Sequence, residues 1–304
     1  MAYFLAIDAG GTKADYVLAD ENRELGRVRG NTIKRMRVDA ETATAHLDTA
    51  LAELASLTGV SMNSVTCTCV GTAGNTVSLV TNWLHAEIGN RVAGELILIG
   101  DVEIALDAAF YGGPGILVLA GTGSNIAGRN SEGVLMGAGG WGPALADQGS
   151  GHRIGLAGLR AGFLAVDEGR STPLLNEVMQ FWKLESLEHM IEFANSRPAP
   201  DFSRLTELVL RCALHGDVIS QSVLQDEGKD LGYLVRLMVR RLIQSDDTNT
   251  LPRIAFAGSI MEKVIPVRTA LIESVREEFP NITTLDGVID PVAGALWRAR
   301  SGRH

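Results

Sequence analysis

The stretch IDAGGTKADYVLAD, residues 7–20, joins the end of one apolar run to a second apolar run through a pair of glycines. The apolar run that leads into it ends at Asp8 and predicts a buried strand. Two glycines then impose a turn, and the apolar residues 14–18 predict a second strand beyond it. After a polar turn, residues 24–29 predict a third strand. The chain therefore opens as an antiparallel meander of three strands.

The same pattern begins again at residue 116. Residues 116–120 are apolar, the turn Gly121–Ser124 follows, and residues 125–129 and 134–137 predict two more strands. One glycine turn is weak evidence by itself. Two of them in the same order of strands and turns predict two structurally similar halves.

The segments between and after the meanders have helical and strand periodicities of their own, which is typical of an α/β protein. Asp39 is a suitable N-cap for a helix that ends at Gly59. Gly228 and Gly232, inside the longest predicted helix, indicate that another element packs closely there. The remaining predicted helices span 77–88, 103–110, 217–243 and 291–299, and the remaining strands span 65–70, 96–99, 253–257 and 282–285.

Length and charge narrow the class of protein. The chain has 304 residues, which predicts two domains because single domains usually run to ~100–200 residues. Its formal net charge is −9, and its one short basic run is Lys34–Arg37. We interpret this run as a solvated loop or the rim of a substrate site. A nucleic-acid binder would show a basic patch or stripe, so we expect no nucleic-acid partner.

The N-terminus lacks the basic start and the long apolar stretch of a signal peptide, and no run approaches the ~20 apolar residues that span a bilayer. We therefore expect a cytoplasmic protein without a membrane partner. Cys67 and Cys69 alternate with threonines in a predicted strand, and together with Cys212 they are expected to be buried free thiols. A metal pair is disfavoured because no second Cys or His pair follows at ligand spacing.

Three glycine turns follow apolar strands: residues 8–13, Gly121–Ser124 and Gly258–Ser259. Backbone N–H groups that converge in such a turn bind phosphate, and ligands of α/β sheets bind at the carboxyl ends of strands. The simpler interpretation is a tight hairpin, which we favour for Gly258 taken alone. Neither the P-loop motif nor the dinucleotide motif occurs. The sequence therefore predicts a phosphate site of another kind.

Four motifs together carry a resemblance. IDAGGTKADYVLAD resembles the first phosphate motif of the actin-like sugar-kinase superfamily, VLAGTGSNIAG (118–128) its second, and IAFAGSI (254–260) its adenosine motif. GAGGWGPALADQGSG, residues 137–151, is similar to the signature of N-acetylglucosamine kinases and the wider BadF/BadG/BcrA/BcrD ATPase family. The match covers nearly the whole chain in the right order.

The resemblance implies an α/β fold of two ribonuclease-H-like (actin-like ATPase) domains, each a mixed five-stranded sheet flanked by helices, with a cleft between them. The N-terminal domain would comprise residues 1–112 with the C-terminal helix 287–304, and the other domain residues 113–286. ATP and Mg²⁺ would lie in the cleft, and domain closure would precede phosphoryl transfer to a small amino sugar. The resemblance also implies a homodimer.

Three aspartates are placed for phosphoryl transfer to a sugar hydroxyl, which needs positioning, charge neutralisation and a base. Asp8, at the first glycine turn, is predicted to hold Mg²⁺, largely through water, although it could simply cap the turn. The resemblance assigns to Asp101 the role of base for the sugar hydroxyl, although it could also cap the next helix. By the same resemblance, Asp147 accepts hydrogen bonds from sugar hydroxyls.

The resemblance also assigns the other contacts. Asn31 would contact the sugar, and Trp141, between Gly140 and Gly142, would form an apolar wall of the sugar site unless it is a core residue. The side chains of residues 73–75 differ from those of the family, which leaves the sugar open. Lys13 could equally be a solvated lysine. The expected phosphate and adenosine contacts are Gly11, Thr12, Lys13, Thr122, Gly123, Ser124, Gly258 and Ser259.

The favoured function is therefore an ATP-dependent kinase for N-acetylglucosamine or glucosamine, with N-acetylmuramic acid also open. An ATPase that activates a radical enzyme would need exposed thiolates for an iron–sulfur cluster. A non-catalytic nucleotide or sugar sensor is a third candidate, although every expected acid is present. A glycosidase that uses Asp101 and Asp147 would leave the phosphate turns without a purpose. The zinc-bearing glucokinases are disfavoured because their Cys-x-Cys-Gly-x-x-Gly-Cys run is missing.

Overall fold

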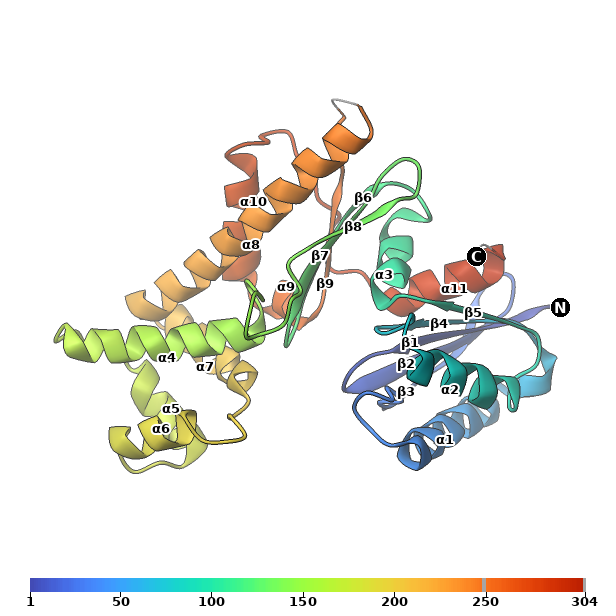
Figure 1. The fold of residues 1–304 in the computed structure, drawn as a ribbon, viewed down its shortest axis with the longest axis horizontal. Helices are drawn as coiled ribbons and strands as arrows, with labels where there is room; N and C mark the ends of the chain where they lie inside the picture. Colours follow the sequence, from blue (N-terminus) through green and yellow to red (C-terminus); the bar gives the residue numbers. More distant parts are fainter. Residues whose placement is uncertain (248–249, 303–304) are drawn as a thin grey trace. The chain divides into compact units, whose positions relative to one another are not determined.

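The computed structural model describes residues 1–247 and 250–302, and the chain in it divides into two compact units (Figure 1). Unit 1 comprises Met1–Gly113 and Ile289–His304. Unit 2 comprises Pro114–Val288. Each unit has its own sheet and its own hydrophobic core, as expected for a chain with an internal structural repeat.

The predicted domain boundaries differ from this division by at most two residues. The predicted N-terminal domain spans 1–112 with 287–304, and the predicted second domain spans 113–286. The boundary near residue 112 falls where Gly112 adopts a φ of 82°. A residue with a side chain rarely adopts this conformation, so the glycine marks a sharp break between the units. Residues 303–304 of the predicted last segment lie outside the described residues.

Unit 1 contains the five-stranded mixed sheet that the resemblance implied. The strand order is β3-β2-β1-β4-β5, in which β1, β2 and β3 form the antiparallel meander and β1, β4 and β5 are parallel. The carboxyl ends of the three parallel strands therefore share one edge of the sheet. The strands are β1 (Tyr3–Ala9), β2 (Lys13–Ala19), β3 (Glu24–Asn31), β4 (Val65–Thr72) and β5 (Glu95–Ile99).

Helices cover both faces of this sheet. Leu5 and Ile7 pack in the core beside α1 and α2, whereas Ala6, which points the other way, packs beside α3 and α11. A Cβ on Gly294 would lie 1.8 Å from the carbonyl oxygen of Ile104, so only glycine lets α11 approach α3 this closely. The helices are α1 (Ala40–Thr58), α2 (Ser78–Gly89), α3 (Asp101–Phe110) and α11 (Pro291–Ser301), with a short 3₁₀ turn η1 (Met62–Ser64).

Unit 2 contains a four-stranded sheet within the described residues, in the order β8-β7-β6-β9, rather than the predicted five strands. The predicted strand 282–285 forms only an isolated bridge, in which Thr284 pairs with Ile254. Gly287, with a φ of 68°, then turns the chain away before a ladder can form. The strands are β6 (Gly115–Ala120), β7 (Ser124–Arg129), β8 (Leu135–Ala138) and β9 (Ile254–Ala257).

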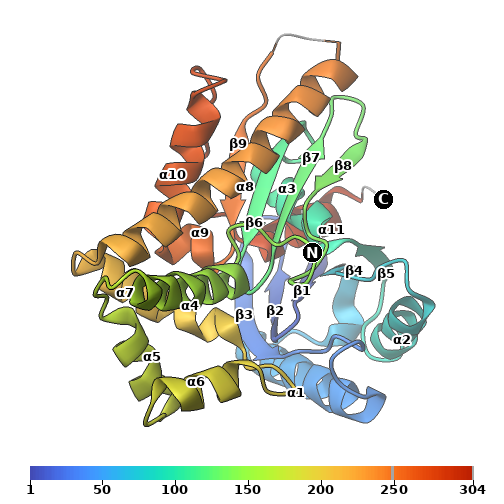
Figure 2. The same cartoon turned by 60° about the vertical axis from the view of Figure 1, so that its left-hand side comes forward.

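The longest helix of unit 2, α8, packs along α10, and Figures 1 and 2 both show the two side by side. A Cβ on Gly228 would lie 2.5 Å from the Val267 carbonyl oxygen, and one on Gly232 would lie 3.0 Å from that of Leu271. The predicted close approach at both glycines is therefore confirmed. The helices are α4 (Gly151–Asp167), α5 (Leu174–Trp182), α6 (Leu187–Ala194), α7 (Thr206–Leu214), α8 (Val218–Ser245), α9 (Ser259–Lys263) and α10 (Ile265–Arg276), with the 3₁₀ turn η2 (Phe202–Leu205).

The cysteines lie where the sequence predicted. Cys67, Cys69 and Cys212 are all buried free thiols. Burial raises the pKa of the Cys67 thiol to about 11 and that of the Cys69 thiol to about 12. Thiols of this kind are poor metal ligands, because a ligand has to be the thiolate. Separately, no helix in the described ranges is long and apolar enough to cross a membrane.

Candidate active site

The carboxylates of Asp8 and Asp101 lie at the carboxyl edge of the unit 1 sheet, close enough for their charges to interact. Asp8 lies near the end of β1, and Asp101 is the first residue of α3, directly after β5. Burial, followed by the negative charge of Asp101, raises the pKa of the Asp8 carboxyl to about 7. Two acids in this arrangement are costly to ionise together unless a cation joins them. Their position makes them candidates for magnesium binding and proton transfer.

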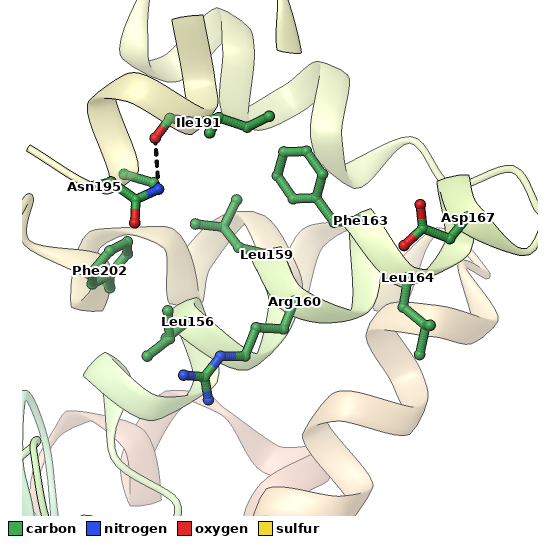
Figure 3. Close-up of a pocket in the computed structure, with 10 residues that line it drawn as sticks. Leu156, Leu159, Arg160, Phe163, Leu164, Asp167, Ile191, Asn195 and Phe202 are labelled. Carbon is green, nitrogen blue, oxygen red and sulfur yellow. Dashed lines mark hydrogen bonds between the residues drawn. The ribbon is translucent and has the colours of Figure 1, made fainter. Parts of the chain in front are cut away.

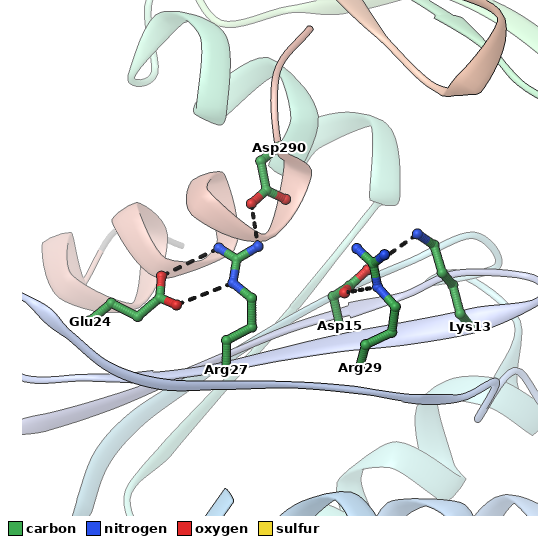
Figure 4. A network of polar contacts seen from close by, with 6 residues as sticks. All are labelled: Lys13, Asp15, Glu24, Arg27, Arg29 and Asp290. Atoms are coloured by element: carbon green, nitrogen blue, oxygen red, sulfur yellow. Dashed lines mark hydrogen bonds and ion pairs between the residues drawn. The ribbon is translucent and has the colours of Figure 1, made fainter. Parts of the chain in front are cut away.

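The neighbouring acids have cationic partners already (Figure 4). The Asp15 carboxylate lies 2.6 Å from Nε of Arg29, and the Asp290 carboxylate lies 2.6 Å from a terminal nitrogen of Arg27. Lys13 is 3.9 Å from Asp15 and is half exposed. Neither Asp8 nor Asp101 forms an ion pair within the described residues. Of these four acids, Asp8 and Asp101 are therefore the two without an ion-pair partner among the described residues.

Asp101 does not serve as the helix cap, which was the alternative role considered for it. Gly100 is the N-cap residue of α3, and its N–H donates to the Glu103 carboxylate at 3.0 Å. Within the described residues, the Asp101 carboxylate accepts only from the N–H of Val102, at 2.9 Å. The carboxylate therefore remains available as a proton acceptor.

The first glycine turn is open where a phosphate would approach. A Cβ on Gly10 would lie 2.8 Å from the Lys13 carbonyl oxygen, whereas one on Gly11 would meet nothing within 4 Å. Thr32 directly follows β3, and its hydroxyl holds the turn by donating to the Gly10 carbonyl at 2.8 Å. The backbone N–H groups of Gly11 and Thr12 form no hydrogen bond in the part of the chain that is described. Free N–H groups beside an open glycine are the elements of an anion site.

The second glycine turn, in unit 2, is held by the segment that follows the signature. The N–H of Ser124 donates to the Asp147 carboxylate at 3.0 Å, and its hydroxyl donates to the Gln148 carbonyl at 2.7 Å. The first N–H groups of α4 donate to the carbonyls of Gly121 and Thr122. Asp147 is only 5% exposed. In this structure its carboxylate therefore shapes the turn, and its predicted contact with sugar hydroxyls stays a prediction.

The turn leaves two backbone donors unused. Across the described residues, the N–H groups of Thr122 and Gly123 form no hydrogen bond. They lie next to the N-terminus of α4, whose dipole favours anions. The turn therefore resembles that of unit 1, where the N–H groups of Gly11 and Thr12 likewise form no hydrogen bond among the described residues.

The third glycine turn adjoins the second. A Cβ on Gly258, whose φ is 89°, would lie 2.3 Å from the Ala120 carbonyl oxygen, and the Ser259 hydroxyl lies 3.8 Å from the Cβ position of Gly121. The two turns meet because β6 and β9 are parallel neighbours. Unit 2 therefore brings together the predicted phosphate and adenosine residues of its two turns.

The signature loop presents its tryptophan to solvent. Gly140 and Gly142 have φ values of 72° and 88°, and the N–H of Trp141 donates to the Ala146 carbonyl. Trp141 is 73% exposed, so the alternative of a core tryptophan is wrong. An exposed indole held between two glycines is suited to covering a ligand.

Asn31 lies at the end of β3 on a pocket of about 420 Å³ in unit 1. Lys13, His46 and Glu53 also line it. His46 is fixed by a 2.9 Å hydrogen bond between Nδ1 and the Thr32 carbonyl. The pocket adjoins the first glycine turn through Thr32, which agrees with a contact between Asn31 and a substrate but does not test it.

Sequence reasoning missed one buried acid of unit 2. Glu227 in α8 is 5% exposed; it accepts a 2.9 Å hydrogen bond from the N–H of Gly149 and another from Nε of Arg153. Burial raises the pKa of the Glu227 carboxyl. A signal was available, because residue 227 falls in the apolar series Ile219, Val223, Leu231, at the spacing of one helical face.

A further groove, of about 480 Å³, lies between α4 and α6 (Figure 3). Leu156, Leu159 and Phe163 line it, with the charged groups of Arg160 and Asp167 on the same helix face. None of the predicted site residues is part of it. The groove is therefore separate from the turns and acids described above.

A model of the BadF/BadG/BcrA/BcrD ATPase family matches residues 5–299. The chain belongs to this family.

Two characterised proteins and one solved structure are similar to this family member over nearly their full lengths. The N-acetylmuramic acid/N-acetylglucosamine kinase of Clostridium acetobutylicum is 27% identical, with 99% of each chain covered. The N-acetyl-D-glucosamine kinase of Dictyostelium discoideum is 29% identical, with 99% of this chain and 98% of that protein covered. A proposed N-acetylglucosamine kinase of Chromobacterium violaceum has the same fold, with a TM-score of 0.73, 24% identity and 97% and 98% of the two chains covered.

Proposed function

We propose that this protein is an ATP-dependent kinase that phosphorylates a hydroxyl of an amino sugar of the N-acetylglucosamine or glucosamine type. The observation that carries the proposal is the pair Asp8 and Asp101 beside an open glycine turn in unit 1. Membership of an ATPase family and similarity to two amino-sugar kinases support it.

In the proposed reaction, a sugar hydroxyl attacks the terminal phosphorus of ATP, and the bond to the bridging oxygen of ADP breaks. Asp101 accepts the proton of the hydroxyl, which is the task of a general base. The N–H groups of Gly11, Thr12, Thr122 and Gly123 donate to phosphate oxygens.

The cation belongs to Asp8. Its carboxylate oxygens fit Mg²⁺, which prefers oxygen ligands, keeps several waters and would neutralise charge on the transferred phosphate. Among the described residues, no group of three or more His, Cys, Asp or Glu side chains could hold a metal. A magnesium ion at Asp8 would therefore take its other ligands from water and phosphate.

The contacts to adenosine and sugar are proposed in the same way. Gly258 and Ser259 would contact the adenosine, and Lys13 a phosphate. Asn31, Asp147 and the Gly140–Gly142 loop would bind the sugar, with Trp141 against its ring. The predicted homodimer stays a prediction, which a mass measurement by light scattering checks.

The proposal is tested by assaying ADP release from MgATP with a panel of amino sugars and plain hexoses, with the product mass measured for each. We expect N-acetylated or free amino sugars to gain one phosphate and plain hexoses to be poor acceptors. ADP release that no sugar accelerates would contradict the proposal. It would favour an ATPase that activates a radical enzyme, although the three buried thiols do not offer the ligands that its cluster needs.

A further inference from the structure

Residues 147–152, called the linking segment here, hold the second glycine turn at both of its ends. An aspartate side chain and a carbonyl that precede Gly149 accept from the N–H and the hydroxyl of Ser124, at 3.0 and 2.7 Å. The first two N–H groups of α4, which follow Gly149, donate to the carbonyls of Gly121 and Thr122, at 2.8 and 3.2 Å. Gly149 therefore lies between the two pairs of hydrogen bonds that shape the turn.

Gly149 is itself fixed by α8. Its N–H donates to the Glu227 carboxylate at 2.9 Å, and both residues are buried. Gly149 has a φ of 69°, and a Cβ there would lie 2.8 Å from a methyl carbon of Leu231 and 3.3 Å from the Glu227 carbonyl oxygen. A side chain would fit neither the backbone conformation nor the space, so glycine lets the linking segment approach α8 this closely.

Arg153 makes a second attachment between α4 and α8. Its Nε donates to the other oxygen of the Glu227 carboxylate at 2.9 Å, and a terminal nitrogen donates to the Asp230 carboxylate at 2.7 Å. Its backbone N–H donates at 3.1 Å to the hydroxyl of Ser150, the N-cap residue of α4. One guanidinium therefore joins the start of α4 to two acids of α8.

Stability alone does not explain a carboxylate at residue 227. Burial raises the pKa of the Glu227 carboxyl, against the hydrogen bond from Gly149 and the charge of Arg153. An ion pair of this kind adds little net stability, because the loss of hydration offsets most of the attraction. What the carboxylate supplies is two acceptor oxygens in fixed directions. Its two donors belong to the linking segment and to α4, so Glu227 holds one in register with the other.

We propose that Glu227, together with Arg153, is a positioning residue for ATP, which holds the linking segment so that the N–H groups of Thr122 and Gly123 point at the phosphates. Both residues act through the linking segment and not by contact with the nucleotide. This inference rests on the proposed kinase function. It has a distinctive sign: loss of the Glu227 charge weakens ATP binding, whereas charge repulsion alone would make the neutral variant bind the triphosphate more tightly.

The test uses calorimetry to measure two dissociation constants, one for a non-hydrolysable ATP analogue with Mg²⁺ and one for adenosine, in the parent and in Glu227→Gln. The amide has one acceptor oxygen, so either Gly149 or Arg153 loses its acceptor. We expect the Kd for the analogue to rise by about tenfold, the scale of one hydrogen bond. The Kd for adenosine, which has no phosphate, should stay at the parent's value. A purely structural role would change both constants alike.

Asp217→Asn is the matched control. Asp217 is buried in the same unit, and its carboxylate caps α8 by accepting from the N–H of Ser220. It lies about 15 Å along the helix axis from Glu227. The substitution removes a negative charge and should lower the stability of unit 2, but the ratio of the two dissociation constants should remain that of the parent.

Asp230→Asn is the second variant, for use if Glu227→Gln does not fold. The Asp230 side chain is 51% exposed, so its loss leaves the core intact. It frees one side of Arg153 and should raise the Kd for the analogue by about twofold, the scale of one exposed ion pair.

Three outcomes overturn the inference and leave the proposed function standing. They are a Kd for the analogue at or below the parent's in the folded variant, a parallel loss of adenosine binding, and the same change of ratio in Asp217→Asn. A parent that binds no ATP analogue overturns both the inference and the proposed function.

Discussion

The two glycine turns are built alike but completed differently. In unit 1, the turn after β1 is held by the Thr32 hydroxyl, and Asp8 beside it forms no ion pair within the described residues. In unit 2, the turn after β6 is held by a carboxylate, because Asp147 accepts the N–H of Ser124. Among the residues that the structure describes, each turn has two backbone N–H groups without a hydrogen bond.

The difference shows how a repeated unit can take on a separate task. The acid of unit 2 is a structural part of its turn, whereas within the described residues Asp8 and Asp101 of unit 1 form no ion pair. We infer that the chemistry belongs to unit 1 and that unit 2 contributes binding.

The largest effect is expected for Asp101→Asn, which removes the proposed base of unit 1. Loss of a general base typically costs roughly 10²–10⁴ in rate, and kcat for the preferred amino sugar should fall by that order. Binding of a non-hydrolysable ATP analogue, measured by calorimetry, should not change. Asp226→Asn, at an exposed position of α8, is the control. Turnover equal to the parent's would remove Asp101 as the base.

A second prediction concerns Asp8 in protein freed of metal by a chelator. Its pKa is raised from 3.8 to about 7, so its stabilising contribution is present below pH 3.8 and is lost as the pH rises through about 7. At about pH 8, Asp8→Asn should therefore increase the free energy of unfolding by about 2–4 kcal/mol.

Denaturant unfolding of parent and variant across the pH range checks this expectation. The difference should narrow steadily as the pH falls and should vanish below pH 3.8, where the parent carboxyl is protonated in both states. Mg²⁺ should stabilise the parent and not the variant, since a ligand stabilises only the state that binds it. A variant less stable than the parent at high pH would show that the Asp8 carboxylate is needed for the turn itself.

Substitution of Asp147 should lower the stability of the fold, in contrast to substitution of Asp8. Asp147→Ala leaves the buried N–H of Ser124 without an acceptor and should cost about 1–3 kcal/mol of stability. Asp147→Asn keeps a side-chain oxygen and should cost much less. The Asn variant also tests the predicted sugar contact: a raised KM for the sugar in a stably folded protein supports it, whereas an unchanged KM leaves only the structural role.

The sequence predicted the elements whose signals are local. Asp39 was expected to cap α1 and does so, and the two glycines of α8 marked a close helix approach. The meander of unit 1 followed from short apolar runs separated by turns, because each pairing there involves neighbours in the chain.

The features that the sequence did not predict correctly depend on residues that are distant in the chain. Residues 282–285 have the composition of a strand, but whether a strand forms depends on its neighbour Ile254, and only a bridge results. That Asp147 accepts the N–H of Ser124 could not be inferred, since 23 residues separate them and the bond exists only once the turn is folded. Glu227 was visible as an acid in an apolar stripe, but its partner Gly149 was not.

The smallest effect on stability, with a clear effect on binding, is expected for Trp141→Ala. The side chain is 73% exposed, so its removal should change stability by no more than about 0.5 kcal/mol. If the indole covers the sugar, the KM for the sugar should rise more than the KM for ATP. Leu145→Ala removes an 80% exposed side chain from the same hairpin and is the control for lost apolar surface. A larger rise in the KM for ATP would assign the tryptophan to the nucleotide, and the whole signature loop of unit 2 would then serve the phosphate turn that Asp147 supports.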